Sequence, residues 1–237
     1  MTRVTAWTMT TTVIVDDSSP PIIYSDGWTL GGDTGLDSNE YNGTVHQAAS
    51  NGLHLTYPFT GMFTPCVIQN RNGRFESPCH VFSGSQISVY GTLDSPAVNG
   101  IATSTYSIDN ISSITTVYTG ENYLTIPDLQ SHLLLYQSPV VSDGPHTLTI
   151  TVSNITNGSP KYYLDFFVVD VSTLENTSQV IVDDTSQEVN YVGNWTESHA
   201  FNEYLGTDHK APSSGNANAT YAFNGMVLAI EIMYVPY

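Results

Sequence analysis

The hydrophobic pattern along the chain is that of many short β-strands. Eight segments rich in β-branched and aromatic residues, several alternating apolar with polar positions, lie at 11–16, 53–59, 85–94, 104–109, 113–118, 131–138, 146–154 and 162–170. Turn-forming clusters such as DSPAVNG, SDGP and TNGSP separate them, and no segment keeps a helical period. Connections this short leave no room for crossover helices. The pattern therefore predicts an all-β fold, an antiparallel β-sandwich and most simply a jelly roll.

A second pattern is an internal repeat of about one domain length. The stretch NEYNGTVHQA (39–48) returns as NEYLGTDHKA (202–211), with seven of ten letters identical. Ahead of it VIVDD recurs whole, and behind it TYPFTGM returns as TYAFNGM. Matches in a fixed order with small gaps indicate duplication. We expect a jelly-roll domain at 10–171, a linker at 172–179 and a truncated second copy at 180–237.

Residues 62–84 interrupt this pattern in the first copy. They contain both cysteines, and without them the strand segments on either side adjoin across a short turn. The second copy loses the repeat after the same Gly-Met pair, whose codons can carry a typical fungal donor splice site. One hypothesis is an intron-derived insertion. The alternative is a genuine long loop closed by a Cys66–Cys79 disulfide.

The net charge and the targeting signals limit the classes of binding partner and the localisation that we expect. The 237 residues carry 22 acidic and 5 basic side chains, a formal net charge of −17, so neither nucleic acid nor an anionic membrane surface is expected. The chain has no apolar run of about 20 residues, so the sequence predicts no membrane-spanning helix. Seven Asn-x-Ser/Thr sequons together favour a secreted or cell-surface glycoprotein, although the N-terminus lacks the apolar region of a secretory signal.

The succession VDD…IIYSDGW…NEYNGTVH…LTYPFTG…YYLDFFVV resembles the galactose-binding-like jelly-roll domains of basidiomycete fungi. Two such domains in tandem resemble the oyster-mushroom (Pleurotus) lectins. The resemblance covers the first copy fully and the second only to Gly225. It implies calcium-associated binding of glycans that contain galactose or N-acetylgalactosamine, while homo-oligomerisation is left open.

A calcium site is expected around the loop at 32–44. Its oxygen-bearing side chains suit a hard cation, and the ligands we predict from it are Asp37, Asn39, Glu40 and Thr44. Asp165 is a carboxylate within an apolar strand, and a buried carboxylate must be paired or bind metal. In the resembled domains an early loop and the last strand often share one calcium, which adds Asp165 to the set. The alternative is that Asp165 faces solvent or accepts backbone hydrogen bonds.

The ligand contacts predicted are Tyr41, Asn42 and Tyr118, which lie in loops or near strand ends, and His46, which lies in a strand. His46 recurs as His209, where it could bind a sugar hydroxyl or satisfy a neighbouring residue. Tyr24 and Trp28 recur as well, and they could offer a flat face to a sugar or fill the core.

Catalysis is not expected, because the chain has no His-Glu-x-x-His, no Gly-x-Ser-x-Gly and no phosphate loop. The first hypothesis is a lectin whose two copies would give avidity. A glycoside hydrolase or the accessory domain of a glycan-active enzyme is the second, since paired carboxylates leave no local signature. A structural ectodomain is the third.

Overall fold

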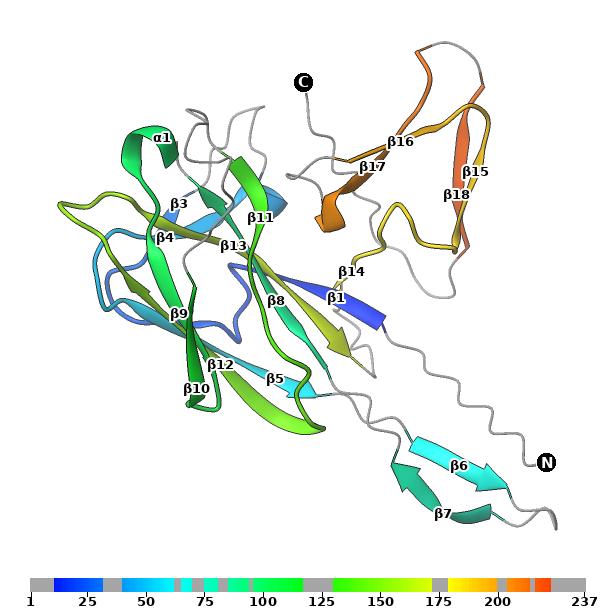
Figure 1. Ribbon diagram of the computed structural model, residues 1–237, viewed down its shortest axis with the longest axis horizontal. Coiled ribbons are helices and arrows are strands. Elements are labelled where there is room, and N and C mark those ends of the chain that lie inside the picture. Colours follow the sequence, from blue (N-terminus) through cyan, green and yellow to red (C-terminus); the bar gives the residue numbers. More distant parts are fainter. Residues whose placement is uncertain are drawn as a thin grey trace. The chain divides into compact units, whose positions relative to one another are not determined.

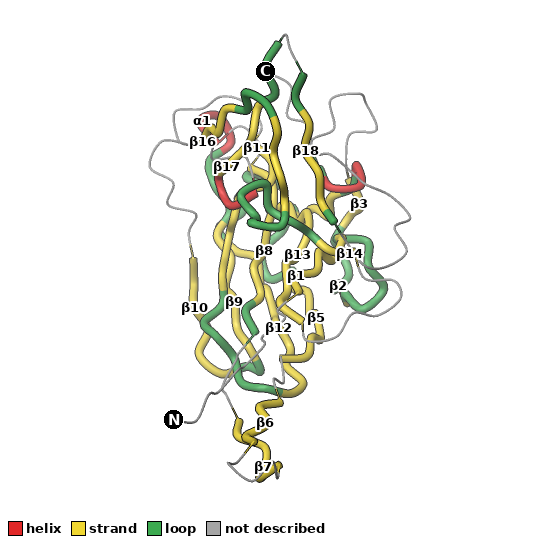
Figure 2. Tube along the Cα trace, turned by 90° about the vertical axis from the view of Figure 1, so that its right-hand side faces the viewer, coloured by secondary structure: helices red, strands yellow, loops and turns green. Residues whose placement is uncertain are grey.

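The computed structural model describes residues 11–31, 40–61, 65–69, 75–80, 85–93, 96–116, 130–171, 179–199, 204–213 and 216–222. The chain divides into two compact units, unit 1 (Met1–Ile181) and unit 2 (Val182–Tyr237). Strands dominate both units (Figures 1 and 2), and the helical elements in these ranges are short: α1 (Pro96–Asn99) and the 3-10 turns η1 (Tyr41–Gly43) and η3 (Tyr204–Gly206). No helix in the described ranges has the length and apolar character needed to span a bilayer.

Unit 1 is a sandwich of two antiparallel sheets (Figure 1). The first sheet has the order β11 (Gln130–Gln137), β8 (Ile87–Leu93), β13 (Tyr162–Val171), β1 (Thr11–Asp16) and β14 (Gln179–Val180). The first sheet also contains β4 (Val45–Ala48), which pairs with β13, and β3 (Thr29–Gly31), which pairs with β4. The second sheet has the order β10 (Ile111–Thr116), β9 (Thr103–Ile108), β12 (Gly144–Ser153), β5 (His54–Gly61) and β2 (Ile23–Tyr24). The predicted antiparallel β-sandwich is confirmed.

The core forms between the sheets because the strands alternate. In β5 every second side chain is buried, and β12 buries Leu148, Ile150 and Val152 with no exposed surface. From the other sheet, strands β8, β11 and β13 contribute the fully buried residues Ile87, Val89, Leu133 and Leu164 to the core. Alternation of period two is what places these side chains on a single face.

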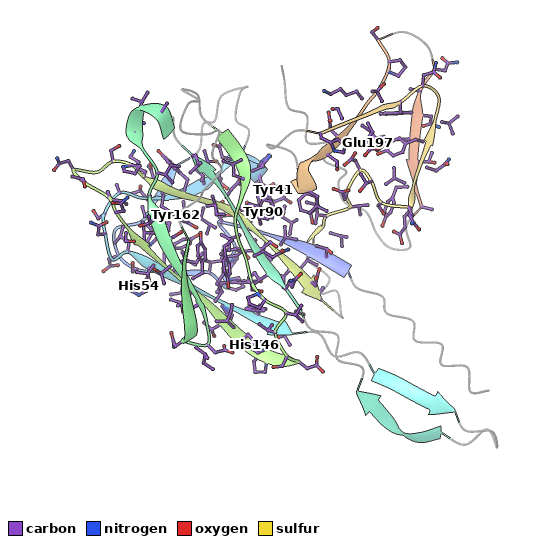
Figure 3. The ribbon with its side chains drawn as sticks, in the orientation of Figure 1. Tyr41, His54, Tyr90, His146, Tyr162 and Glu197 are labelled. Atoms are coloured by element: carbon purple, nitrogen blue, oxygen red, sulfur yellow. The ribbon has the colours of Figure 1, made fainter. Side chains whose placement is uncertain are left out.

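Two bulges reverse that alternation on the first sheet. The register of β13 against β8 shifts between Leu164 and Phe166, so Leu164 and then Phe167 belong to the core. The rings of Tyr41 and Tyr90 pack against Phe166 instead (Figure 3). Strand β11 is also irregular between Gln130 and Leu133, and His132 there has a φ of +55°. Bulges of this kind re-aim side chains, and here they create a second buried cluster away from the main core.

The segment at 62–84 contributes to neither sheet of the sandwich in its described part. Strands β6 (Pro65–Gln69) and β7 (Phe75–His80) pair with each other, with Cys66 opposite Cys79. On either side of the segment, Gly61 pairs with Gly144 and Ser85 forms a bridge with Val141. Both ends of the segment therefore meet the same short stretch of backbone.

Unit 2 has four strands in its described residues. Strand β15 (Val189–Val192) pairs with β18 (Asn218–Tyr221), and β16 (Thr196–His199) pairs with β17 (Thr207–Lys210). These two strand pairs keep the registers of unit 1, since Tyr24↔Leu55 corresponds to Tyr191↔Ala219 and Leu30↔His46 corresponds to Glu197↔His209.

The predicted linker and repeat boundary fall around β14. Most of the linker at 172–179 lies outside the described residues, but Gln179 and Val180 pair with Ile14 and Val13 of β1. The start of the second VIVDD thus adds a short strand to unit 1, and the contact boundary falls after Ile181.

Candidate functional site

A buried aspartate joins three elements at the edge of unit 1. Asp17, which follows β1 and has no exposed surface, accepts a hydrogen bond at Oδ1 from the Thr44 hydroxyl (2.7 Å). Its Oδ2 contacts Nδ1 of His46 on β4, and its backbone carbonyl accepts the Tyr24 hydroxyl (2.7 Å). Trp28 lies with its ring centroid 5.2 Å from that of Tyr24. We call Asp17, Tyr24, Trp28, Thr44 and His46 the Asp17 cluster.

The Asp17 cluster fixes the orientation of the His46 ring. The ring stacks on Tyr24 with centroids 4.1 Å apart and planes 10° from parallel. Because Nδ1 faces a carboxylate, the proton of the neutral ring belongs on Nδ1, which leaves Nε2 as an acceptor. Nε2 has no hydrogen-bond partner among the described residues, and it is not buried. The arrangement therefore presents one oriented polar atom beside the Tyr24 ring. Tyr24 and Trp28 are partly buried and pack against the hydrophobic core.

Unit 2 builds the same arrangement, which we call the Asp184 cluster. Thr207 donates to Asp184 Oδ1 (2.7 Å), His209 Nδ1 contacts Oδ2, and Tyr191 donates to the Asp184 carbonyl (2.9 Å). The rings repeat too: Tyr191 stacks on His209 at 4.2 Å and lies 5.0 Å from Trp195. The main difference is exposure, since the Asp184 side chain is 22% exposed whereas that of Asp17 is fully buried.

Asp165, the other carboxylate that the sequence singled out, is fully buried in the bulge of β13. Its Oδ1 accepts the backbone N–H of Tyr41 (2.9 Å), and its Oδ2 lies 3.5 Å from Nε2 of His132. Both Oδ2 and Nε2 are buried without a hydrogen bond. Its backbone carbonyl also accepts the N–H of Asp17 (3.0 Å), which connects this second buried group to the Asp17 cluster.

Burial is the main cause of the pKa shifts of Asp165 and His132. It raises the pKa of the Asp165 carboxyl well above its usual value, and the nearby charges of Glu40 and Asp17 raise it further, against the Tyr41 N–H, which lowers it. Burial also lowers the pKa of His132 to about 4. Both shifts favour the uncharged forms, as expected where solvation is lost.

The predicted ligand contacts have different surroundings. Asn42 is exposed in η1 with a left-handed φ of +53°, a conformation that asparagine tolerates well. His46 is partly exposed in the Asp17 cluster. Tyr41 is 9% exposed, and its ring packs on Phe166, because η1 folds it onto the outer face of β13; its contact with a ligand stays a prediction. Tyr118 lies outside the described residues.

The predicted calcium ligands are only partly brought together. Glu40 lies close enough to Asp165 to raise the pKa of Asp165, whereas the Thr44 hydroxyl donates to Asp17. Asp37 and Asn39 lie outside the described residues. Within the described ranges, no group of three or more His, Cys, Asp or Glu residues is placed to hold a metal ion.

Sequence reasoning missed Asp17 and His132. The repeated VIVDD contained a signal for Asp17, because each copy ends in the aspartate that meets the repeated histidine. No comparable signal marked His132, whose position depends on a bulge.

No protein-family model matches this chain, and no curated protein matches it. Among solved structures, a CBM35 from Cellvibrio japonicus Abf62 matches 71% of this chain and 96% of its own, at 9% identity and a TM-score of 0.41. A family 35 carbohydrate-binding module from Clostridium thermocellum matches 67% and 96%, at 11% identity and a TM-score of 0.38. A family two carbohydrate esterase from Cellvibrio japonicus matches 68% of this chain and 34% of its own, at 14% identity and a TM-score of 0.36. At these values no function is carried across.

Proposed function

We propose that this chain is a non-catalytic glycan-binding protein of the lectin type, with the Asp17 cluster as its binding site in unit 1. The observation that carries the proposal is the unpaired Nε2 of His46, whose ring is held by Asp17 and stacked on Tyr24, with Trp28 against Tyr24. Sugar rings are bound by such a combination, in which a fixed polar atom bonds a hydroxyl and an aromatic ring covers the apolar face. The resemblance stated from the sequence adds galactose-type sugars as the expected ligands.

The Asp184 cluster supports a second site on the same chain. It repeats the orientation of the imidazole, with the His209 side chain 17% exposed against 18% for His46. Two weak sites on one chain bind a multivalent surface more tightly than either does alone. We therefore expect agglutination of cells that carry the glycan.

The test is sugar-inhibited haemagglutination together with a glycan array. His46→Gln should weaken binding to unit 1 by roughly threefold to tenfold, because one hydrogen bond contributes about 0.5–1.5 kcal/mol. The matched control is His146→Gln: His146 also contacts a carboxylate, that of Asp109, but its second ring nitrogen is bonded to the Ser142 carbonyl (Figure 3). If His46→Gln is folded by circular dichroism and its binding is unchanged, the Asp17 cluster is not the binding site.

The two-site part is tested separately with His209→Gln. It should leave binding of a monovalent sugar to unit 1 unchanged and should reduce agglutination. If agglutination is as strong as in the wild type, the Asp184 cluster is not a binding site.

An enzyme is the alternative, because a carboxylate-bound imidazole with a free Nε2 is also how a hydrolase orients its general base. The described residues place no serine or cysteine within hydrogen-bond distance of the Nε2 atom of His46. Release of 4-nitrophenol from 4-nitrophenyl acetate or from 4-nitrophenyl galactosides, abolished by His46→Gln, would favour the enzyme.

Calcium remains part of the proposal. Support comes from Oδ2 of Asp165, an orphaned buried oxygen, and from the neighbouring charge of Glu40. The residues that would hold the ion are Glu40, Thr44 and Asp165 with Asp37 and Asn39, and it would bring the loop and β13 together. Secretion is proposed as well: six of the seven sequon asparagines fall in described residues, and all six are exposed.

A further inference from the structure

The Asp17 and Asp184 clusters differ in the residue that lies opposite the histidine. All five residues of the Asp17 cluster have identical counterparts in the Asp184 cluster. The strand that pairs with the histidine strand is different, because TLGG at 29–32 returns as TESH at 196–199. In the observed registers Leu30 pairs with His46, and Glu197 pairs with His209. An apolar side chain therefore stands in unit 1 where unit 2 has a carboxylate.

The residue opposite each histidine lies beside the imidazole. Directly opposite residues of an antiparallel pair project from the same face of the sheet, with Cβ atoms about 4.5–5.5 Å apart. Leu30 is 61% exposed, and the side chain of Glu197 is 51% exposed (Figure 3). The side chains of His46 and His209 also reach solvent, since they are 18% and 17% exposed. A sugar bound at the imidazole therefore lies next to Leu30 in unit 1 and next to Glu197 in unit 2.

Leu30 favours an apolar group on the ligand. When such a group packs on the exposed leucine, apolar surface of both partners is removed from water. An ammonium group in the same place loses part of its hydration and gains no hydrogen bond from the leucine. The Asp17 cluster is therefore expected to select against a positive charge at this position.

Glu197 favours a cation. Its carboxylate accepts no hydrogen bond in the described part of unit 2, and its Oε1 lies 3.9 Å from Nε2 of His199, which is beyond hydrogen-bond distance. Lys210 follows His209 on β17, so alternation turns it to the other face of the strand pair, where it lies 3.5 Å from Asp208. The Glu197 oxygens are therefore available to an ammonium group of a ligand, and hydrogen bonds between charged groups are stronger than neutral ones.

We propose that Glu197 makes the Asp184 cluster a site for amino sugars with a free ammonium group, whereas Leu30 makes the Asp17 cluster select their N-acetylated form. The proposal rests on the proposed glycan binding and assigns a different ligand class to each of its two sites. A hydroxyl group of the sugar donates to Nε2 of the histidine in both clusters. The neighbouring substituent then packs its acetyl methyl group on Leu30 or donates from its ammonium to Glu197.

The test compares D-galactosamine with N-acetyl-D-galactosamine, which differ in an ammonium against an acetamido group. Each sugar is titrated into the full chain near neutral pH, and the NMR signals of the His46 and His209 rings report one Kd for each cluster. Spectra of His46→Gln and His209→Gln assign these signals. In unit 2 galactosamine should bind about twofold to fivefold more tightly at low salt, and this preference should shrink as salt is added. In unit 1 the acetylated sugar should bind about twofold to fourfold more tightly.

Exchange of the two residues is the matched test. Leu30→Glu should give unit 1 the salt-sensitive preference for galactosamine, and Glu197→Leu should give unit 2 the preference for the acetylated sugar. The control is Thr29→Glu, which adds the same charge to β3 one position away, on the other face of the strand. This control should leave the preference of unit 1 unchanged. All three positions are exposed, so the variants should remain folded, which circular dichroism checks.

The outcomes separate this inference from glycan binding in general. If both clusters have the same preference, or if a preference survives the exchange in a folded variant, the role of Leu30 and Glu197 is overturned and glycan binding stands. A glycan array with bound sugars, but with neither amino sugar bound, also overturns this inference alone. If neither sugar shifts a histidine signal and the glycan array is blank, the proposed function fails and this inference fails with it. Should Leu30→Glu not fold, the exchange at Glu197 decides.

Discussion

Removing the Asp17 carboxylate should cost unit 1 much more stability than the same change costs unit 2. Asp17 is fully buried, and its two side-chain contacts tie β1 to Thr44 and to His46 on β4. Asp17→Ala leaves both partners without an acceptor. Breaking one side of a buried, hydrogen-bonded pair of this kind costs about 3–5 kcal/mol. Against a typical stability of about 5–15 kcal/mol, that is a large share.

Asp184→Ala removes the same two contacts in a more exposed setting. The Asp184 side chain is 22% exposed, so water can replace part of what is lost, and the expected cost is about 1 kcal/mol or less. The two variants are matched in chemistry and in geometry, and they differ in burial. The comparison therefore isolates the contribution of burial.

The measurement is urea and thermal unfolding followed by far-UV circular dichroism, with Asp143→Ala as an exposed-acid control for the change in net charge. The melting temperature of unit 1 should fall by roughly 6–20 °C in Asp17→Ala, since about 2–4 °C corresponds to each kcal/mol at this size. Equal losses in the two variants, or a loss below about 1 kcal/mol for Asp17→Ala, would refute the reasoning.

Three further changes have expected outcomes. Deleting residues 62–84 should leave the melting temperature of unit 1 unchanged or higher, because β6 and β7 pair with neither sheet and a long loop is removed; loss of soluble protein would count against this. The contact with His146 lowers the pKa of Asp109, and the hydrogen bonds of His146 raise the pKa of His146. The contribution of this contact to stability should therefore be lost below about pH 4 and again above about pH 6.5. Asp109→Asn should flatten both limbs of the stability–pH profile. If calcium binds at Asp165, a chelator should lower the melting temperature and weaken agglutination, Asp165→Ala should make the chelator ineffective, and no change with chelator would exclude the site.

The sequence predicted the long strands because their own residues specify them. The runs that became β5, β8, β9, β12 and β13 are β-branched and aromatic, and alternation in β5 and β12 matches the buried face. The short strands β2 and β3 were not predicted, and of β4 only His46 was placed in a strand. With two to four residues each, they depend on pairing with β5 and β13 rather than on their own composition.

The candidate site was only half predictable, for a similar reason. His46 was visible as a repeated residue, but its partner Asp17 lies 29 positions away, and only the folded sheets bring them together. The bulges that aim Asp165 and His132 at each other depend on the register between strands, which single-strand patterns do not contain. Tyr41 appeared to be a loop residue because the turn η1 is polar around it, yet the turn folds its ring inward.

The two clusters show which part of the chain determines the site geometry. In unit 1, β4 and β5 also pair with β13 and β12 of the sandwich. Their counterparts β17 and β18 pair only with β16 and β15 in the described part of unit 2, yet the contacts around Asp184 match those around Asp17. The geometry is therefore set by two antiparallel strand pairs, one nested within the other, and one aspartate. The larger sandwich supplies the burial that distinguishes Asp17 from Asp184.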